Sequence, residues 1–233
     1  TYGFYSEAEL RPGSKELLRI IADASSTHLK ASMTMYEPGQ LPMYMLTWPD
    51  NRKDQAGTGI SWEYKLDSNW LLRAALRLDY IHTALTSQEA KDHISILGVP
   101  DASRTELLKN SSFSATRKIS PWLKSSISLA YAERMPTATE LYGFYLFNAQ
   151  DGYDYLGNPG LKPEQSMQGE FSLTAQGKKT RVRATVFYNH IRHFISGTVN
   201  PSFSTMTIGA NGVKNFSALP HAKLAGLEAS LFL

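Results

Sequence analysis

The feature that most restricts the fold of this chain is a repeated alternation of apolar and polar side chains. In residues 70–81, WLLRAALRLDYI, every even-numbered residue is apolar or aromatic, while the odd-numbered ones include Arg73, Arg77 and Asp79. A period of two predicts a β-strand that separates an apolar from a polar environment. The same alternation recurs in residues 57–66, 123–134, 164–176, 180–195 and 225–231.

The connections between the predicted strands alternate between short and long. Tight turns join 57–66 to 70–81, 113–120 to 123–134, and 164–176 to 180–195. Long polar stretches separate these hairpins, at roughly 37–56, 82–112, 135–163 and 196–221. Loops in soluble β domains are mostly short. Outer-membrane barrels instead combine short periplasmic turns with long extracellular loops, and tilted strands of ~9–11 residues suffice to cross a bilayer. The sequence therefore favours an all-β, transmembrane antiparallel β-barrel.

The alternation by itself also fits a soluble β-sandwich binding module, whose apolar phase would face an inner core. In a barrel, Glu63, Arg73 and Arg183 would face a wet lumen, whereas in a sandwich they would form a solvated outer face. A general porin and a barrel-type enzyme are further alternatives. The pattern alone leaves all of these open.

Composition and missing motifs exclude several classes of function. The net charge is +3 and no dense basic run occurs, so we expect no nucleic-acid partner. The chain has no cysteine, which excludes disulfides and thiolate metal sites. Hydrolase motifs, zinc-protease motifs and phosphate-binding glycine loops are also missing, so we expect that the protein is not an enzyme.

Two linked motifs between residues 134 and 164 carry a more specific signal. The first consists of Arg134, Pro136, Thr137, Glu140, Leu141 and Tyr142, and the second of Gly157, Asn158, Pro159, Leu161, Lys162, Pro163 and Glu164. FYNHIRHFI at 187–195 and Ala222…Gly226-Leu227-Glu228 follow in order. This series resembles the TonB-dependent outer-membrane receptors, in which one strand ends in a segment like RxPTxxELY and the next begins after GNPxLKPE. The resemblance covers residues 120–233 well and is looser upstream.

The chemistry of these motifs predicts a structural role. Thr137 and Glu140 have the spacing of a capping box, which starts a helical turn. Leu161 can anchor the base of the loop, and Pro163 suits the start of a strand because it donates no hydrogen bond. We therefore assign the family-motif residues to structure and not to ligand binding: Arg134, Pro136, Glu140, Asn158, Pro159, Leu161, Pro163, Glu164, Gly226 and Glu228.

The resemblance implies a 22-stranded barrel with an N-terminal plug, placed in the outer membrane of a Gram-negative bacterium. We expect residues 1–233 to supply about ten strands of that single barrel domain, without the plug and the final strands. The implied function is import of an extracellular small-molecule ligand with energy from the TonB complex, which would contact the plug. We expect the ligand to be a metal chelate, foremost a siderophore-type iron complex, with no permanently bound cofactor. Copper, cobalamin and oligosaccharide receptors of the same fold are alternatives.

The candidate ligand-binding residues lie in the predicted extracellular loops. They are Tyr145, Phe147, Tyr153, Tyr155, His82 and His93, whose rings could stack on a bulky chelate. Met43 and Met45 form an alternative site for soft copper, because thioethers suit Cu(I). Met33 and Met35 share the phase of Leu29 and Ala31, so we expect them to face lipid.

Overall fold

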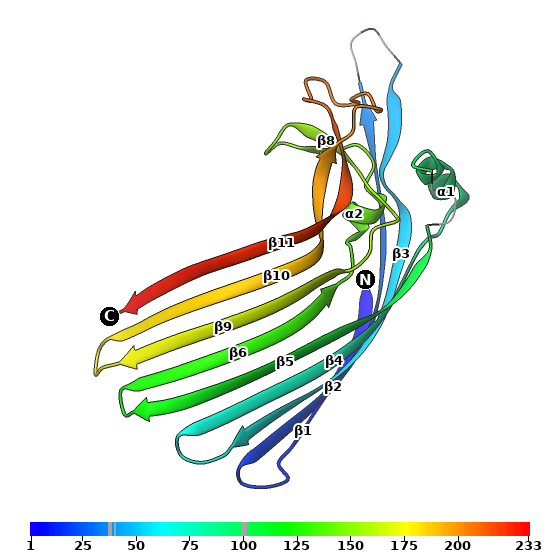
Figure 1. The fold of residues 1–233 in the computed structure, drawn as a ribbon. Coiled ribbons are helices and arrows are strands. Elements are labelled where there is room, and N and C mark those ends of the chain that lie inside the picture. Colours follow the sequence, from blue (N-terminus) through cyan, green and yellow to red (C-terminus); the bar gives the residue numbers. More distant parts are fainter. Residues whose placement is uncertain (37–38, 40, 99–101) are drawn as a thin grey trace.

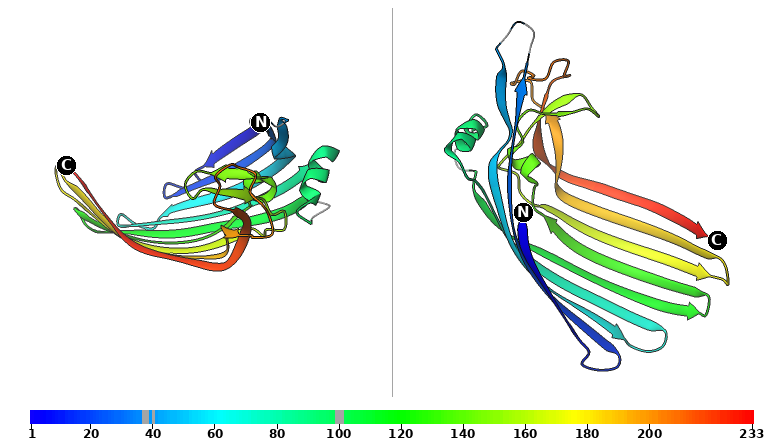
Figure 2. Two further views of the ribbon diagram at one scale, coloured as in Figure 1. Left: turned by 90° about the horizontal axis from the view of Figure 1, so that it is seen from above. Right: turned by 180° about the vertical axis from the view of Figure 1, so that it is seen from behind.

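The protein, described by a computed structural model for residues 1–36, 39, 41–98 and 102–233, forms a curved, open β-sheet (Figures 1 and 2). The eleven-stranded sheet of the described residues has the order β1-β2-β3-β4-β5-β6-β9-β10-β11-β8-β7. Neighbouring long strands are antiparallel, and β8 joins β11 in a short parallel pair. No helix among the described residues is long and apolar enough to cross a membrane.

The long strands form the wall of the sheet. They are β1 (Tyr2–Leu10), β2 (Glu16–Met35), β3 (Met43–Lys65), β4 (Trp70–Leu85), β5 (Arg104–Ser120), β6 (Leu123–Arg134), β9 (Glu164–Gln176), β10 (Arg181–Val199) and β11 (Val213–Phe232). Two helices and two short strands lie in the long connections: α1 (Gln88–Ser95), α2 (Ala138–Tyr142), β7 (Leu146–Asn148) and β8 (Tyr153–Leu156). The predicted all-β antiparallel sheet is therefore confirmed.

Short and long connections occupy opposite ends of the wall. The turns at 11–15, 66–69, 121–122 and 177–180 lie at one end, and the described parts of the connections after β2 and β4, together with those at 135–163 and 200–212, lie at the other (Figure 1). Residues 37, 38, 40 and 99–101 of the predicted loops lie outside the described residues.

Several strands are longer than the sequence pattern predicted. β3 begins at Met43, β5 at Arg104 and β11 at Val213, all within stretches that we expected to be loops. Met45, Leu46 and Thr47 are buried in succession, so this part of β3 lies between two covered faces. The alternation of apolar and polar residues disappears there, which is why the extension was missed.

The two faces of the wall differ as predicted. Leu76, Ile127 and Leu173 are 61%, 50% and 39% exposed on the outer, convex face. On the other face, Arg77 contacts Asp23 at 2.8 Å and Asp79 at 2.5 Å. Among the described residues no second sheet covers the apolar face, so the β-sandwich alternative is wrong.

The core lies at the end with the long connections, where α1, α2 and their flanking segments fold onto the inner face. Its buried side chains are Ile81, Leu85, Ala90, Ile94, Ala102, Leu108, Met135, Leu141, Tyr142, Leu161 and Ile195. Among the described residues, the part of the wall nearer the short turns has no such core, because its apolar side chains point outward. This division suits a wall that faces lipid and a rim that holds folded loops.

Candidate functional site

The first motif forms a charged junction between β6, α2 and β9. The Arg134 guanidinium donates to Glu140 at 2.8 and 3.0 Å, and to Glu164 at 2.7 Å. The Thr137 side chain accepts from the Glu140 N–H at 3.2 Å, while the Glu140 carboxylate accepts from the Thr137 N–H at 2.7 Å. This reciprocal pair is a capping box. The junction fixes where the long connection leaves one strand and joins the next.

The charge of Glu140 is stabilised within this junction. Burial alone raises the pKa of its carboxyl, but hydrogen bonds from Arg134 and the Thr137 N–H outweigh burial and lower the pKa overall. The carboxylate is therefore ionised at neutral pH.

The second motif packs directly onto α2. The Gly157 N–H donates to the Gly143 carbonyl at 2.6 Å, and the Asn158 N–H donates to the Glu140 carbonyl at 2.8 Å. The Arg104 guanidinium of β5 donates to the carbonyls of Pro159 and Leu161. Leu161 is 2% exposed within the core. The motif thus anchors the base of the connection.

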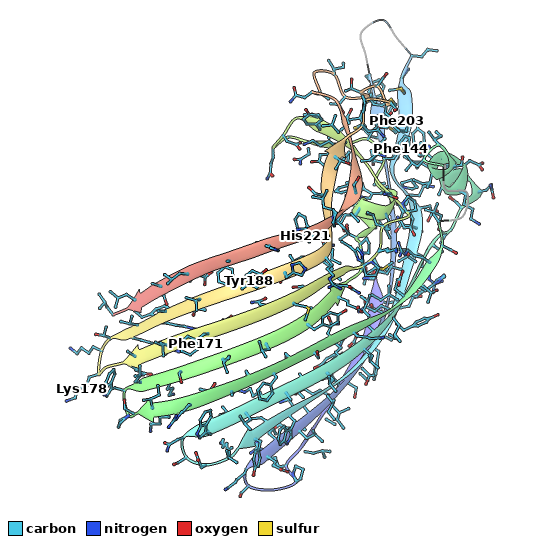
Figure 3. The ribbon with its side chains drawn as sticks, viewed as in Figure 1. Phe144, Phe171, Lys178, Tyr188, Phe203 and His221 are labelled. Atoms are coloured by element: carbon cyan, nitrogen blue, oxygen red, sulfur yellow. The ribbon has the colours of Figure 1, made fainter. Side chains whose placement is uncertain are left out.

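Beyond this anchor, segments from three long connections form an apolar rim cluster. Met45, Phe144, Tyr145, Leu156 and Val213 are buried in it, and Met35, Leu97, Phe203 and Met206 pack against it. Figure 3 shows Phe144 and Phe203 at the end of the molecule that carries the long connections. The cluster makes the loops a packed unit instead of independent hairpins.

A polar group lies beside the rim cluster. The Lys214 ammonium contacts the Asp151 carboxylate at 2.7 Å and lies 4.2 Å from the centre of the Tyr153 ring. The Tyr155 hydroxyl also donates to Asp151, at 2.7 Å. Hydrogen bonds from Lys214 and then Tyr155 lower the pKa of the Asp151 carboxyl. Two of the predicted ligand residues, Tyr153 and Tyr155, are therefore brought together around one cation.

The other predicted ligand residues have different surroundings. Tyr145 is buried in the rim cluster, and Phe147 is 48% exposed. The His93 ring packs on Phe144 with centroids 4.1 Å apart, and burial lowers the pKa of its imidazole. The expected loop position of His82 is wrong, because His82 lies within β4.

His82 also points away from the inner face. It shares the phase of the exposed residues Leu78 and Tyr80, and its ring contacts Thr105 of β5 at 2.9 Å. Its sequence neighbours Ile81 and Thr83 are buried on the inner face. The polar run that follows it in the sequence hid the fact that the strand continues to Leu85.

The methionines lie in a strand ladder and not in a loop. Met43 and Met45 belong to β3, where Met43 pairs with Met35 and Met45 pairs with Met33 across the β2–β3 ladder. The expected lipid-facing position of Met33 and Met35 is also wrong. They share the phase of Asp23, which contacts Arg77 on the inner face. Asp23 was the signal in the sequence that could have placed them.

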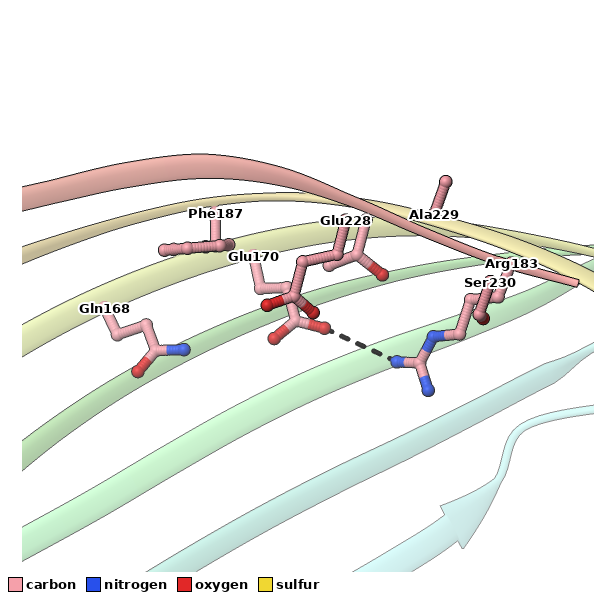
Figure 4. Close-up of a pocket in the computed structure, with 8 residues that line it drawn as sticks. Gln168, Glu170, Arg183, Phe187, Glu228, Ala229 and Ser230 are labelled. Carbon is pink, nitrogen blue, oxygen red and sulfur yellow. Dashed lines mark ion pairs between the residues drawn. The ribbon is translucent and has the colours of Figure 1, made fainter.

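The inner wall carries an open groove of about 780 Å³ at β9, β10 and β11 (Figure 4). Its lining includes Glu170, Arg183 and Glu228, and Arg183 contacts Glu170 at 3.5 Å. Gly226 allows the Phe187 ring to lie over the neighbouring strand, because a Cβ there would be 2.7 Å from that ring. Among the described residues no group of three His, Asp or Glu side chains could hold a metal ion.

Comparisons with known proteins agree with this architecture. Residues 26–233 match the family model described as "TonB dependent receptor-like, beta-barrel". The chain is 27% identical over 182 residues to heme/hemopexin utilization protein C of Haemophilus influenzae. This aligned region covers 68% of the chain and 23% of that relative.

Solved structures with the same fold include three receptors or transporters. The copper transporter OprC has a TM-score of 0.71 at 15% identity, over 98% of this chain and 33% of that one. The Serratia marcescens hemophore receptor HasR, in complex with HasA and heme, has a TM-score of 0.68 at 14% identity, and the match covers 97% of this chain and 38% of that one. The ferric enterobactin receptor PfeA of Pseudomonas aeruginosa has a TM-score of 0.63 at 15% identity, and the match covers 97% of this chain and 32% of that one. The chain thus spans less than two fifths of each of these proteins.

Proposed function

Because the chain belongs to the TonB-dependent receptor β-barrel family, we propose that it is part of an outer-membrane receptor that imports an extracellular metal chelate. The proposed cargo is an iron complex of the siderophore type. The proposed energy source is the TonB complex, acting through a plug that the family's receptors carry inside the barrel.

The observation that carries the choice of cargo is the aromatic character of the folded rim. Phe147 is exposed, and Tyr153 and Tyr155 are half-buried beside the Lys214 ammonium. Rings hold a bulky chelate by stacking and shape, and a cation attracts an anionic one. A bare ion would instead need several ligand atoms converging on one point.

The proposal is tested by removing the two tyrosines in the whole receptor. We expect the double change Tyr153→Ala and Tyr155→Ala to lower uptake of radiolabelled iron, supplied as a ferric siderophore, by about tenfold, as the loss of two stacking rings implies. Tyr188→Ala on the outer face is the matched control and leaves uptake unchanged. Unchanged uptake in the double variant, with normal receptor abundance, would contradict the proposal. Supplying haem in parallel tells whether the chelate is a porphyrin.

A second candidate cargo is copper, favoured by the methionine ladder. Met33, Met35, Met43 and Met45 share one face of the β2–β3 ladder, and Met206 packs against the same rim cluster. Several thioethers on one face are the ligand type that Cu(I) prefers. Met45 is buried beside Phe144 and Tyr145 and Met35 packs against the same cluster, so these two also fit packing, whereas Met33 and Met43 are 36% and 39% exposed.

Mutation separates the two cargoes. If the cargo is a chelate, replacing Met43 and Met45 by Leu leaves uptake nearly intact, while trimming residues 144–155 abolishes it. The reverse result, with copper uptake lost in the methionine variant, would replace the chelate by a soft metal.

A further inference from the structure

Four cationic or ionisable side chains form a compact group on the outer face of β10 and β11. Arg192 pairs with His221 across the two strands, and His190 pairs with Lys223. The rings of His190 and His221 are 5.9 Å apart, centre to centre. We call these four residues the outer basic cluster. Figure 3 shows His221 and Tyr188 on neighbouring strands toward the end with the long connections.

The strand pairing shows that this cluster faces outward. His190 and Arg192 continue the phase of Val186 and Tyr188, which are 46% and 47% exposed. The opposite phase of β10 carries Thr185, which is 8% exposed on the inner side. The cluster therefore lies on the wall that faces the membrane and not on the lumen.

The pairing also gives the depth of the cluster. One row across β9, β10 and β11 consists of Gly169, Tyr188 and Ala225, and belongs to the apolar band. The next rows toward the long connections are Met167–His190–Lys223 and Gln165–Arg192–His221. The cluster thus begins directly above the apolar band, at the level of lipid headgroups.

No carboxylate forms an ion pair with these cations within the described part of the chain. Glu133 is the acidic residue of the same face on β6, but it accepts from the Tyr131 hydroxyl, the Lys109 N–H and the Gln165 amide. No ion pair involves Arg192 or Lys223 among the described residues. Cations placed diagonally across two strands repel one another unless an anion lies between them.

We propose that the outer basic cluster binds the phosphate of an anionic lipid headgroup in the outer leaflet. Arginine and lysine form charge-assisted hydrogen bonds with phosphate, and the two imidazoles add N–H donors. The position at the edge of the apolar band selects a phosphate attached to acyl chains over one free in solution. The inference rests on the barrel spanning the outer membrane and is independent of the cargo.

Lipid retention by the whole receptor tests the proposal. The receptor is placed in phosphatidylcholine nanodiscs that contain lipid A, either phosphorylated or enzymatically dephosphorylated, and the bound lipid A is counted by native mass spectrometry. We expect the double change Arg192→Gln and Lys223→Gln to weaken binding of phosphorylated lipid A by about 25-fold, at about fivefold for each cation near a membrane surface. Arg192→Lys with Lys223→Arg keeps the charge and retains binding.

The matched control removes two cations from the opposite end of the wall. Lys178→Gln with Lys179→Gln changes the turn between β9 and β10, where Figure 3 shows Lys178, and leaves lipid A binding unchanged. An equal loss in this control would show that only net charge matters and overturn the proposal. Equal binding of dephosphorylated lipid A, or displacement by inorganic phosphate at matched concentration, would also overturn it.

Failure of this inference is distinct from failure of the proposed function. A variant that loses lipid A but still imports the chelate supports the inference and leaves the proposed function intact. Heat-modifiable mobility on gels verifies that each variant forms the barrel.

Discussion

At the scale of single residues, close backbone contact decides what the loop anchor tolerates. A Cβ on Gly157 would lie 2.6 Å from the Leu141 carbonyl oxygen and 2.8 Å from the Tyr142 nitrogen, both fixed backbone atoms of α2. A Cβ on Gly160 would meet only the side-chain oxygen of Asn158, at 3.1 Å. Side chains can move aside where a helix backbone cannot.

We therefore expect Gly157→Ala to destabilise the anchor by about 1–3 kcal/mol, the usual cost of overpacking. Gly160→Ala, with the same added methyl group, is the control and has little effect. Protease resistance of residues 135–163 in the folded receptor is the measurement. Equal resistance in the two variants would contradict the packing argument.

The Glu140 carboxyl makes the same anchor sensitive to acid. Its pKa is lower in the folded chain than in the unfolded chain, so it stabilises the fold fully above the unfolded pKa of about 4.3 and loses that contribution as the pH falls through the folded value. The protection of the α2 amides against hydrogen exchange, corrected for the intrinsic exchange rate at each pH, should therefore fall below about pH 4. Glu140→Gln removes the charge, so the protection of these amides in this variant should be lower at neutral pH and change less with acid. An unchanged acid response in the variant would point to another group.

At the scale of elements, the phase of each strand determines which side chains meet lipid. Ile127 pairs with Phe171 and with Ala115, all in the outward phase of the wall. Ser128 is adjacent in the sequence but borders the inner face. One residue of displacement therefore changes the environment completely.

Ile127→Arg in the whole receptor should destabilise the barrel by roughly 2–4 kcal/mol, because a charge on the lipid face near mid-membrane is costly. Ser128→Arg places the same side chain on the inner face and should cost much less. Denaturant unfolding in lipid vesicles measures both. Similar costs would reject the assigned faces.

At the scale of the whole molecule, the described residues form an arc and not a closed barrel. β1 has a partner strand on one side only. β11 pairs with β10 along one edge, and its other edge pairs only at Val213–Asn215, with β8. Unpaired backbone groups at such edges are costly in lipid, where no water can satisfy them.

Residues 1–233 expressed alone should therefore fail to form a stable membrane barrel. In detergent, we expect aggregation or protease sensitivity instead of a heat-modifiable, protease-resistant monomer. The whole receptor, purified in parallel, is the control. A compact resistant monomer of the 233-residue chain would show that the arc closes without further strands.

The sequence by itself determined the phase of strands with unbroken alternation such as β4, the order of short and long connections and the anchor motif. Each depends on neighbours close in the chain: alternation from Trp70 to Tyr80, the capping spacing of Thr137 and Glu140, and Pro163 before β9. Local geometry is enough to express such patterns.

Only the tertiary structure decided how far the strands extend and what the rim residues face. Met45 and His82 lie in strands because segments distant in sequence pair with them, and Met33 faces inward because its ladder continues the phase of Asp23. Tyr153 and Tyr155 are 59 or more residues away from Lys214 in the sequence, and the pairing of β8 with β11 brings them into contact with it. Such contacts depend on long-range packing, where both faces of a strand are covered and the period of two no longer marks it.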